Sequence, residues 1–158
     1  MRRRPMTLAV VAVTVTSLAV VGVLTGTGGA RENANGSIPV GSLGDINGSW
    51  VAGNDFGAPA PVVGTVSLTI ADGFVLVETG CNTGRARASV VDSRLVLEEL
   101  ATTRKSCPPP LAEQETWVVE MVTNSPRLEL SGPYLSLHWG TNEEFWITLD
   151  QVEDAPTT

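Results

Sequence analysis

The chain has 158 residues, of which 42% are hydrophobic and 17% are charged, so it can form one domain with a buried core. Its formal net charge is −7, but all three arginines of the first five residues precede every acidic residue. Beyond Ala30, 7 Lys and Arg residues face 17 Asp and Glu residues, a net charge of −10. Such a domain repels phosphate backbones, which excludes nucleic acid as a favourable partner.

Residues 6–24 carry no charge and follow a short basic head, a pattern typical of a signal peptide or an N-terminal membrane anchor. The small residues up to Ala30 favour cleavage after that position. The length favours retention, because a helix over residues 6–24 rises about 28 Å, close to the hydrocarbon thickness of a bilayer. For residues 1–30 both interpretations stay open. Both predict export, with any membrane contact made only through residues 6–24.

A polar, glycine-rich stretch follows the apolar segment. Residues 31–44 contain too few apolar side chains to pack, and we predict a flexible linker. A folded domain is expected over residues 45–150. Residues 151–158 are acidic, end in Pro156-Thr157-Thr158, and are predicted to be a disordered tail.

The domain pattern consists of short strands and one helix. Residues 65–70 alternate strictly between apolar and polar, and after the Asp72-Gly73 turn residues 74–78 return, which predicts a hairpin. Further strands are predicted at residues 50–52, 85–90, 94–98, 128–130, 135–137 and 144–149, and loops at residues 54–61 and 108–110. Residues 111–122 have helical spacing. These elements predict a β-dominated α+β fold, an antiparallel curled sheet or open barrel with one helix packed against it.

Particular residues give this pattern a family resemblance. They are Trp50, then Gly80, Cys81 and Asn82, then Thr103 and Cys107, and finally Trp117 on the helix. In this order and spacing, the chain resembles the META/HslJ-like domains of exported bacterial envelope proteins over about residues 45–149. The resemblance implies a small β-rich domain, often lipid-anchored and loosely linked to stress responses, antibiotic tolerance, motility or virulence, without an established reaction. The chain lacks the lipoprotein cysteine of such relatives, and Ala86-Arg87-Ala88 stands where they often have glycine and an aromatic residue.

Cys81 and Cys107 are the two cysteines of the chain. An exported domain with two cysteines most often joins them, and closing a loop of about 26 residues contributes roughly 3.5 kcal/mol in the chain-entropy model. We therefore predict a structural disulfide. A redox-active thiol activated by Arg85, Arg104 or Lys105 is a less favoured alternative, because the chain has no Cys-x-x-Cys pair. Buried free thiols are a third possibility.

His138 and Trp139 form the candidate binding patch. Trp139 stands beside Gly140 at a predicted turn, where an aromatic ring could be exposed, whereas Trp50, Trp117 and Trp146 are expected in the core. As the single histidine, His138 would have to serve any histidine-dependent catalysis, but no motif surrounds it. A zinc site would need Cys81, Cys107, His138 and a carboxylate to converge, so we predict neither a metal nor a cofactor.

These observations favour a non-catalytic domain over an enzyme. We expect an extracytoplasmic protein, secreted or anchored in the cell membrane, that binds an unknown protein or small-molecule ligand. The alternative is a protease-inhibitor-like or structural domain that presents residues 54–61 or 108–110 as a rigid loop. A thiol-redox enzyme is the least favoured hypothesis.

Overall fold

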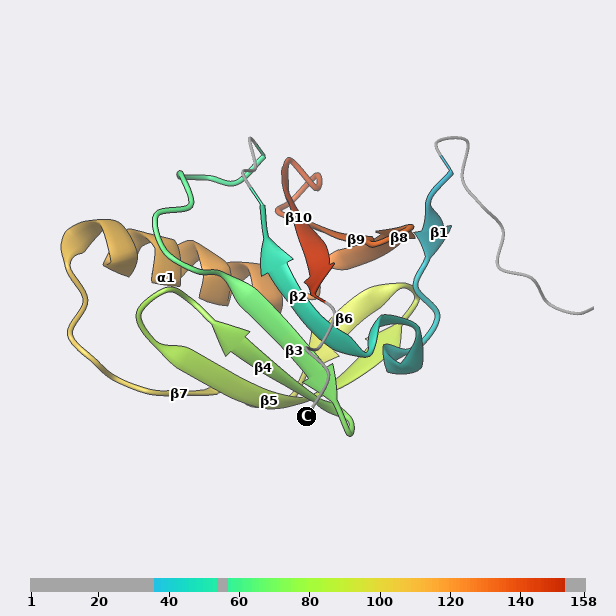
Figure 1. The fold of residues 1–158 in the computed structure, drawn as a ribbon, viewed down its shortest axis with the longest axis horizontal. Helices are drawn as coiled ribbons and strands as arrows, with labels where there is room; N and C mark the ends of the chain where they lie inside the picture. The colour runs from blue at the N-terminus through green and yellow to red at the C-terminus, as the bar shows by residue number, and fades with distance from the viewer. Residues whose placement is uncertain (1–35, 54–56, 153–158) are drawn as a thin grey trace, which may run out of the picture.

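Eight antiparallel strands form a closed barrel in the order β8-β6-β5-β4-β3-β2-β10-β9, and β9 pairs with β8 to complete the ring (Figure 1). The computed structural model describes residues 36–53 and 57–152. The strands are β1 (Ile38–Pro39), β2 (Gly48–Ala52), β3 (Ser67–Ala71), β4 (Phe74–Glu78), β5 (Thr83–Val91), β6 (Arg94–Leu97), β7 (Ala101–Thr102), β8 (Arg127–Ser131), β9 (Tyr134–Trp139) and β10 (Phe145–Val152). The helices are the 3-10 helix η1 (Leu43–Ile46) and α1 (Pro109–Thr123). The predicted β-dominated α+β class is therefore confirmed.

The β3–β4 hairpin shows how the sequence produces the strands. Leu68 and Ile70 on β3, with Val75 and Val77 on β4, are at most 1% exposed, whereas the residues between them face outward. This alternation places one apolar row inside the barrel. The connecting Asp72-Gly73 pair has φ angles of 53° and 77°, as a tight two-residue hairpin turn requires.

Helix α1 corresponds to the helix predicted over residues 111–122 from its helical spacing. Pro108 precedes the helix and Pro109 begins it, where a missing backbone N–H removes no helical hydrogen bond. Its buried face consists of Gln114, Trp117, Val118, Met121 and Val122. The helix packs against β6 and β9.

The barrel closes weakly on the side that the helix covers. β6 and β8 share one residue pair, Arg94 with Arg127, flanked by backbone hydrogen bonds from Leu95 N to Pro126 O and from Leu128 N to Ser93 O. β7 pairs with β5, and within the described part of the chain no strand pairs with the other edge of β7. Helix α1 therefore shields a region where the ladder of backbone hydrogen bonds is incomplete.

The start of the domain differs from the predicted linker over residues 31–44. β1 pairs with β8, and Val40 is 1% exposed in the hydrophobic core. Polar and glycine-rich composition suggested a tether, but isolated apolar side chains such as Val40 suffice to fix a segment at a sheet edge. The prediction of a linker is therefore wrong for residues 37–44, and residues 31–35 lie outside the described range.

The end of the domain also extends further than predicted. Gln151 and Val152 belong to β10, where they pair with Trp50 and Ser49 of β2. The disordered tail predicted for residues 151–158 therefore begins at least two residues too early, and residues 153–158 lie outside the described range. In the part of the chain that the structure describes, no helix has the length and apolarity to cross a membrane. The candidate signal peptide or anchor, residues 1–30, is not among these residues.

Val40 provides a test of the earlier domain start. We expect Val40→Ala to lower the free energy of unfolding by about 2 kcal/mol, because it removes two buried methyl groups and leaves a cavity. Val63→Ala is the matched control, since Val63 is 53% exposed, and should change it by less than about 0.5 kcal/mol. Urea unfolding of both variants measures the difference. Equal effects would show that Val40 does not belong to the core.

Candidate functional site

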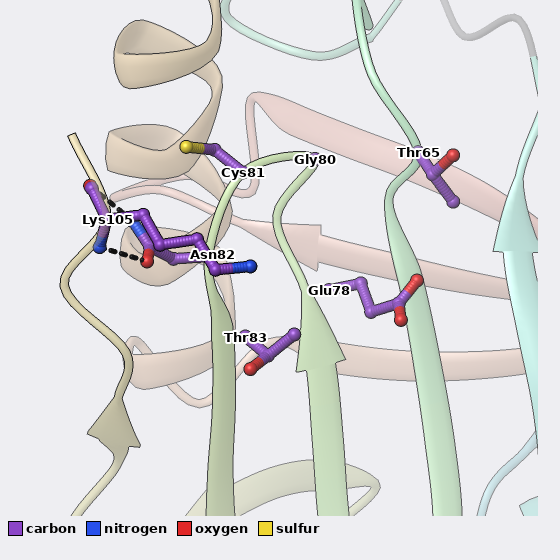
Figure 2. Close-up of a pocket in the computed structure, with 7 residues that line it drawn as sticks. All are labelled: Thr65, Glu78, Gly80, Cys81, Asn82, Thr83 and Lys105. Atoms are coloured by element: carbon purple, nitrogen blue, oxygen red, sulfur yellow. Dashed lines mark hydrogen bonds between the residues drawn. The ribbon is translucent and has the colours of Figure 1, made fainter. Parts of the chain in front are cut away.

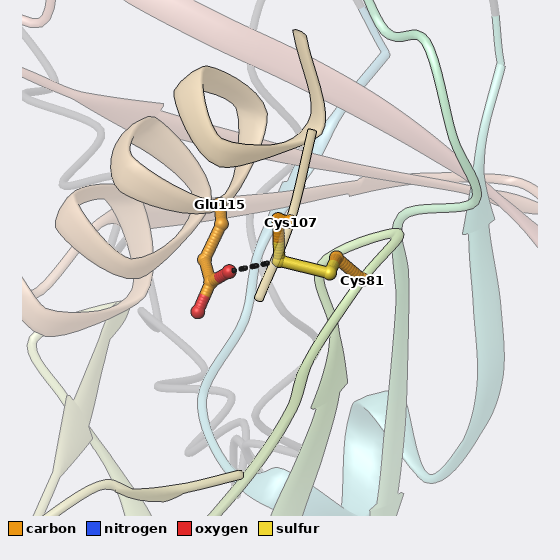
Figure 3. A group of neighbouring side chains, drawn as sticks. All are labelled: Cys81, Cys107 and Glu115. Atoms are coloured by element: carbon orange, nitrogen blue, oxygen red, sulfur yellow. Dashed lines mark hydrogen bonds between the residues drawn. A yellow bond between two sulfur atoms is a disulfide. The ribbon is translucent and has the colours of Figure 1, made fainter. Parts of the chain in front are cut away.

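A disulfide bond joins the β4–β5 connection to the segment that leads into α1. Cys81 and Cys107 are bonded with an S–S distance of 2.01 Å and a Cα–Cα distance of 6.1 Å (Figure 3). The predicted disulfide is therefore present. Neither cysteine offers a free thiol in this state, so the thiol-redox hypothesis loses its nucleophile.

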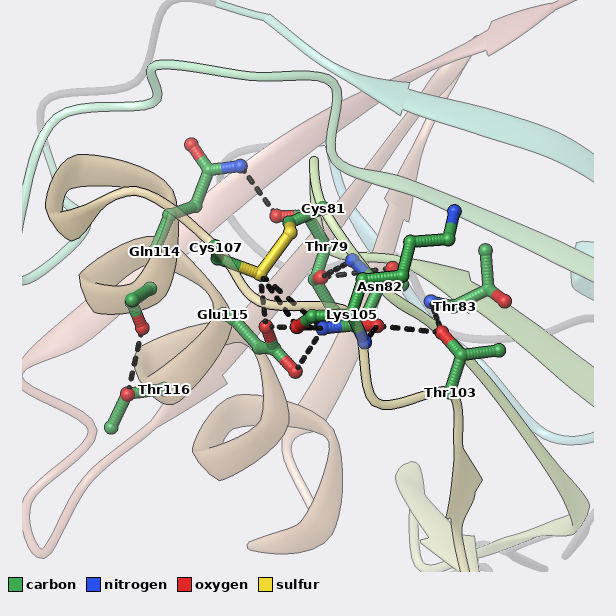
Figure 4. The surroundings of a disulfide bond; sticks show 11 residues. Thr79, Cys81, Asn82, Thr83, Thr103, Lys105, Cys107, Gln114, Glu115 and Thr116 are labelled. Atoms are coloured by element: carbon green, nitrogen blue, oxygen red, sulfur yellow. Dashed lines mark hydrogen bonds between the residues drawn. A yellow bond between two sulfur atoms is a disulfide. The ribbon is translucent and has the colours of Figure 1, made fainter.

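The side chain of Asn82 is the centre of a hydrogen-bond network around this disulfide (Figure 4). Asn82 is 3% exposed. Its Oδ1 accepts hydrogen bonds from Thr103 Oγ1 at 2.8 Å and from Lys105 N at 2.7 Å. Its Nδ2 donates to Lys105 O at 3.1 Å and to the Glu115 carboxylate at 2.9 and 3.1 Å. One amide thus joins the β4–β5 connection, the 103–107 segment and α1. We call this arrangement the Asn82 joint.

The backbone of the β4–β5 connection is fixed by Thr79. Thr79 N donates to Asn82 O at 2.9 Å, and Asn82 N donates to Thr79 Oγ1 at 3.0 Å. Gly80, between them, has a φ angle of 90°, and a Cβ atom there would lie 2.4 Å from Gln114 Nε2. Position 80 therefore requires glycine both for its backbone conformation and for the close approach of the helix.

Gln114 holds the helix from the other side of the same connection. It is 1% exposed. Its Oε1 accepts from Val63 N at 2.6 Å and Gly64 N at 3.0 Å, and its Nε2 donates to Thr79 O at 2.7 Å. The sequence places Gln114 on the apolar ridge of the helix but does not reveal this role. The sequence feature that could have indicated it is a glutamine at a helix position expected to be buried, because a buried amide must form hydrogen bonds.

The residues of the family motif separate into two groups. Gly80, Cys81, Asn82, Thr103 and Cys107 meet at the joint, where Thr103 Oγ1 also accepts from Thr83 N at 3.0 Å. Trp50 and Trp117 lie in the core instead, with exposed fractions of 1% and 3%. The indole N–H of Trp50 donates to Ile46 O at 2.8 Å. The motif therefore describes a structural joint and a core, not one site.

Glu115 brings a carboxylate next to the disulfide. One oxygen lies 3.2 Å from Cys107 Sγ, and the candidate ligand atoms of Cys81, Cys107 and Glu115 all lie within 4.8 Å of one another (Figure 3). A disulfide sulfur carries neither a proton nor a negative charge, so in this state the group offers one anionic ligand rather than three. His138, which the zinc hypothesis required, is not in the group.

The predicted His138–Trp139 patch is wrong. Trp139 is 1% exposed, and its ring lies 6.1 Å from Trp117 at an interplanar angle of 13° and 5.8 Å from Phe145. Adjacent strand residues point to opposite faces, so Trp139 shares the inner face of β9 with Leu137, whereas His138 faces outward.

Trp146, expected in the core, is instead 38% exposed and lies opposite His138 on β10. Its indole covers Gly57, where a Cβ atom would lie 2.4 Å from the ring. The same alternation explains why the predicted exposures of Trp139 and Trp146 are reversed. On β10, the side chain of Trp146 points outward and that of Ile147 points inward.

His138 borders a chain of charged groups on the outer face of the barrel. Glu143 forms ion pairs with Arg94 and Arg127, each at 2.6 Å, and these arginines hold the pKa of Glu143 below its ordinary value. His138 Nε2 lies 3.8 Å from Glu129 Oε2. Burial, and then the charge of Arg127, lower the pKa of His138 from its ordinary value of 6.5. His138 is therefore biased toward the neutral form, unsuited to binding an anion.

Open pockets flank the Asn82 joint on both sides. One of about 220 Å³ is lined by Thr65, Glu78, Gly80, Cys81, Asn82, Thr83 and Lys105 (Figure 2). On the helix side, a pocket of about 430 Å³ contains Arg104, Cys107, Ala112 and Glu115. A groove of about 660 Å³ runs between β7 and α1 and is lined by Leu100, Thr102, Ala112, Glu115, Thr116, Val119 and Thr123. We call the last the β7–α1 groove.

A closed antiparallel barrel with one helix, linked by a disulfide and a buried asparagine, defines a small β-dominated α+β domain. The META domain matches residues 44–151, more than half of the chain, so the chain belongs to the META domain family. The resemblance recognised in the sequence is therefore confirmed.

Solved structures show the same fold. One, described as "NMR structure of the protein", has a TM-score of 0.58 and 18% sequence identity, and the match covers 71% of this chain and 96% of that one. A second, a protein from Burkholderia xenovorans, has a TM-score of 0.54 and 18% identity, covering 71% and 87%. At this identity the likeness concerns the fold alone. A comparison with curated proteins finds no match.

Asn82 provides a test of the joint. We expect Asn82→Ala to lower the free energy of unfolding of the oxidised protein by about 3 kcal/mol, because Thr103, Lys105 and Glu115 lose partly buried hydrogen bonds together. Glu115→Gln is the control, since it keeps an acceptor oxygen for Asn82 and should cost less than about 1 kcal/mol. Guanidinium unfolding under non-reducing conditions measures both. If the two variants were equally stable, Asn82 would not be the centre of the joint.

The lowered pKa of His138 makes stability depend on pH. The unfolded chain takes up the histidine proton more readily than the folded chain, so stability should fall as the pH drops below about 6.5 and level off below the folded-state pKa. In His138→Gln, the slope of stability against pH between about 7 and 5 should be flatter than in the parent. Thermal unfolding across this range measures the slopes, and identical slopes would rule out His138 as their source.

Proposed function

We propose that this protein is a non-catalytic META domain of the cell envelope, exported or membrane-tethered, that binds a protein ligand in the β7–α1 groove. The disulfide supports export, because such bonds persist in oxidising compartments. The basic head and apolar residues 6–24 support the same location. The function rests on the META family and on the surfaces beside the joint.

The observation that carries the proposal is that the polar and sulfur groups of the motif residues near the disulfide are already bonded to neighbouring groups of the domain. Both hydrogens of the Asn82 amide and its oxygen are used within the joint, and both cysteines are bonded. Groups committed in this way cannot also serve as acid, base or nucleophile without dismantling the joint. This supports a structural role for the motif, which fixes α1 to the barrel. A ligand would then bind at the open surfaces beside it.

The β7–α1 groove offers a largely apolar wall. Thr116 Oγ1 donates to Ala112 O at 2.9 Å, and Thr123 Oγ1 donates to Val119 O at 2.7 Å. Because these hydroxyls bond back to their own helix, the threonines add carbon surface to that of Ala112 and Val119. Short side chains along one helix ridge permit close approach of a partner backbone. The edge of β7 that pairs with no described strand stands on the opposite side, so an extended polypeptide segment fits this groove.

The protease-inhibitor-like alternative receives less support. One of its two loops, residues 108–110, is part of the start of α1 and does not project as a separate loop. The other, residues 54–61, lies partly outside the described residues. Binding in the groove is therefore better supported than the protease-inhibitor-like hypothesis.

A photo-crosslinking amino acid at position 116 tests this function in intact cells. Thr116 is exposed and lines the groove, whereas Thr69 lies on the outer face of β3 and is the control position. We expect a discrete adduct from position 116, competed by excess purified parent protein, and none of the same mass from position 69. Absence of an adduct at 116, or the same adduct from both positions, would contradict binding in the groove.

A further inference from the structure

Positive charge is distributed unevenly over the described part of the chain. Arg94 and Arg127 are neutralised by ion pairs with Glu143. The other cations there are Arg85, Arg87, Arg104 and Lys105. None of these four forms an ion pair with a described residue. The unpaired cations thus belong to β5 and to the segment hydrogen-bonded beside it.

Arg85 and Arg87 are held together on the outer face of the barrel by Phe74 of β4. The guanidinium carbon of Arg85 lies 3.9 Å from the centre of the Phe74 ring, and that of Arg87 lies 4.8 Å from it. The two arginines alternate with the buried Ala86, so they share one face with a backbone spacing of about 7 Å. Stacking on an aromatic ring orders two planar donor groups that would otherwise be flexible.

Lys105 extends this line of charge toward the joint. Its backbone N–H and C=O are both bonded to Asn82. Its side chain reaches over the β4–β5 connection into the pocket that Thr83 also lines (Figure 2). Thr83 stands two residues before Arg85 on the same strand face. We call Lys105, Arg85 and Arg87 the cationic row.

Two exposed carboxylates, Glu78 and Glu98, flank the row, and neither forms an ion pair with a described residue. Glu78 lies opposite Thr83 on β4, but its Oε2 accepts a hydrogen bond from Ser67 Oγ at 3.1 Å, on the β3 side. Exposed Leu76 stands between these groups and Phe74 on the same face. The face thus combines three separated cations and apolar surface, with one carboxylate near each end of the row.

We propose that the cationic row binds a flexible linear polyanion, a polymer with carboxylate or phosphate groups that can meet cations about 7 Å apart. Charge complementarity carries this choice, because the row is the unpaired positive line of an otherwise acidic domain. A single extended chain can follow β5 and meet few of the domain's carboxylates, chiefly Glu78 in the Lys105 pocket and Glu98 beside Arg87. A bilayer or a nucleic-acid duplex presents a wide anionic surface that would meet the acidic remainder as well. This site is separate from the β7–α1 groove, so its test is independent of the proposal that the groove binds a protein.

The probes are polygalacturonate, which carries carboxylates, and inorganic polyphosphate, titrated into the oxidised full-length protein in detergent. We expect at least one to bind, with a slope of about −2 in log affinity against log salt concentration for three contacts. Arg85→Gln/Arg87→Gln should lower the affinity at least about tenfold, and Lys105→Gln about threefold. Phe74→Leu keeps every charge but removes the stacking surface, and should also weaken binding.

Arg104→Gln is the matched control for Lys105→Gln. It removes the same charge from the neighbouring position. Both side chains line the pocket on the helix side, but Lys105 also lines the pocket beside Thr83, whereas exposed Arg104 does not. It should change the affinity by less than about twofold. Circular dichroism establishes that each variant is folded. The proposal is overturned if neither polymer binds, if Arg104→Gln equals Lys105→Gln, or if anionic vesicles or duplex DNA bind as tightly as the polymers.

Discussion

The buried amide of Asn82 is the interaction on which the arrangement of helix and barrel depends. An asparagine side chain can donate twice and accept twice, and here every one of these positions is used. The disulfide limits how far the two connected segments can separate, but it does not fix their orientation. The amide does so, because its hydrogen bonds are directional and act on backbone groups of Lys105 and on the Glu115 carboxylate.

The barrel needs such a joint because its strands do not complete the enclosure. One residue pair and two flanking backbone hydrogen bonds close the ring between β6 and β8, and α1 packs against the adjacent strands β6 and β9. The helix is held by two different kinds of interaction. Trp117 packs against Trp139 inside the barrel, which is favourable but weakly directional. Gln114 and Glu115 provide the directional part, each bonded to a backbone or amide partner across the gap.

The sequence predicts the structure well where a local pattern of residues determines it. Strict alternation predicts β3 and β4, helical spacing predicts α1, and two cysteines in a chain expected to be exported predict the disulfide. It is less informative where one side chain decides the outcome. Val40 attaches a segment of linker-like composition to the core, and strand parity alone exchanges the exposures of Trp139 and Trp146. The partners of Asn82 come from segments 21 to 33 residues away, and no local pattern records such contacts.

The net charge of this domain and the arrangement of its charges lead to different conclusions about anionic partners. At short range, the arrangement determines which anions can bind. A net charge of −10 beyond Ala30 disfavours any extended anionic surface. Yet ion pairs remove two arginines from consideration and leave the remaining described cations near one strand. Lys105 belongs to both arrangements, because its backbone is part of the Asn82 joint and its side chain is part of the cationic row. The joint that holds α1 on the barrel thereby also sets the position of a surface charge, so the stability of this region and its recognition chemistry depend on the same amide.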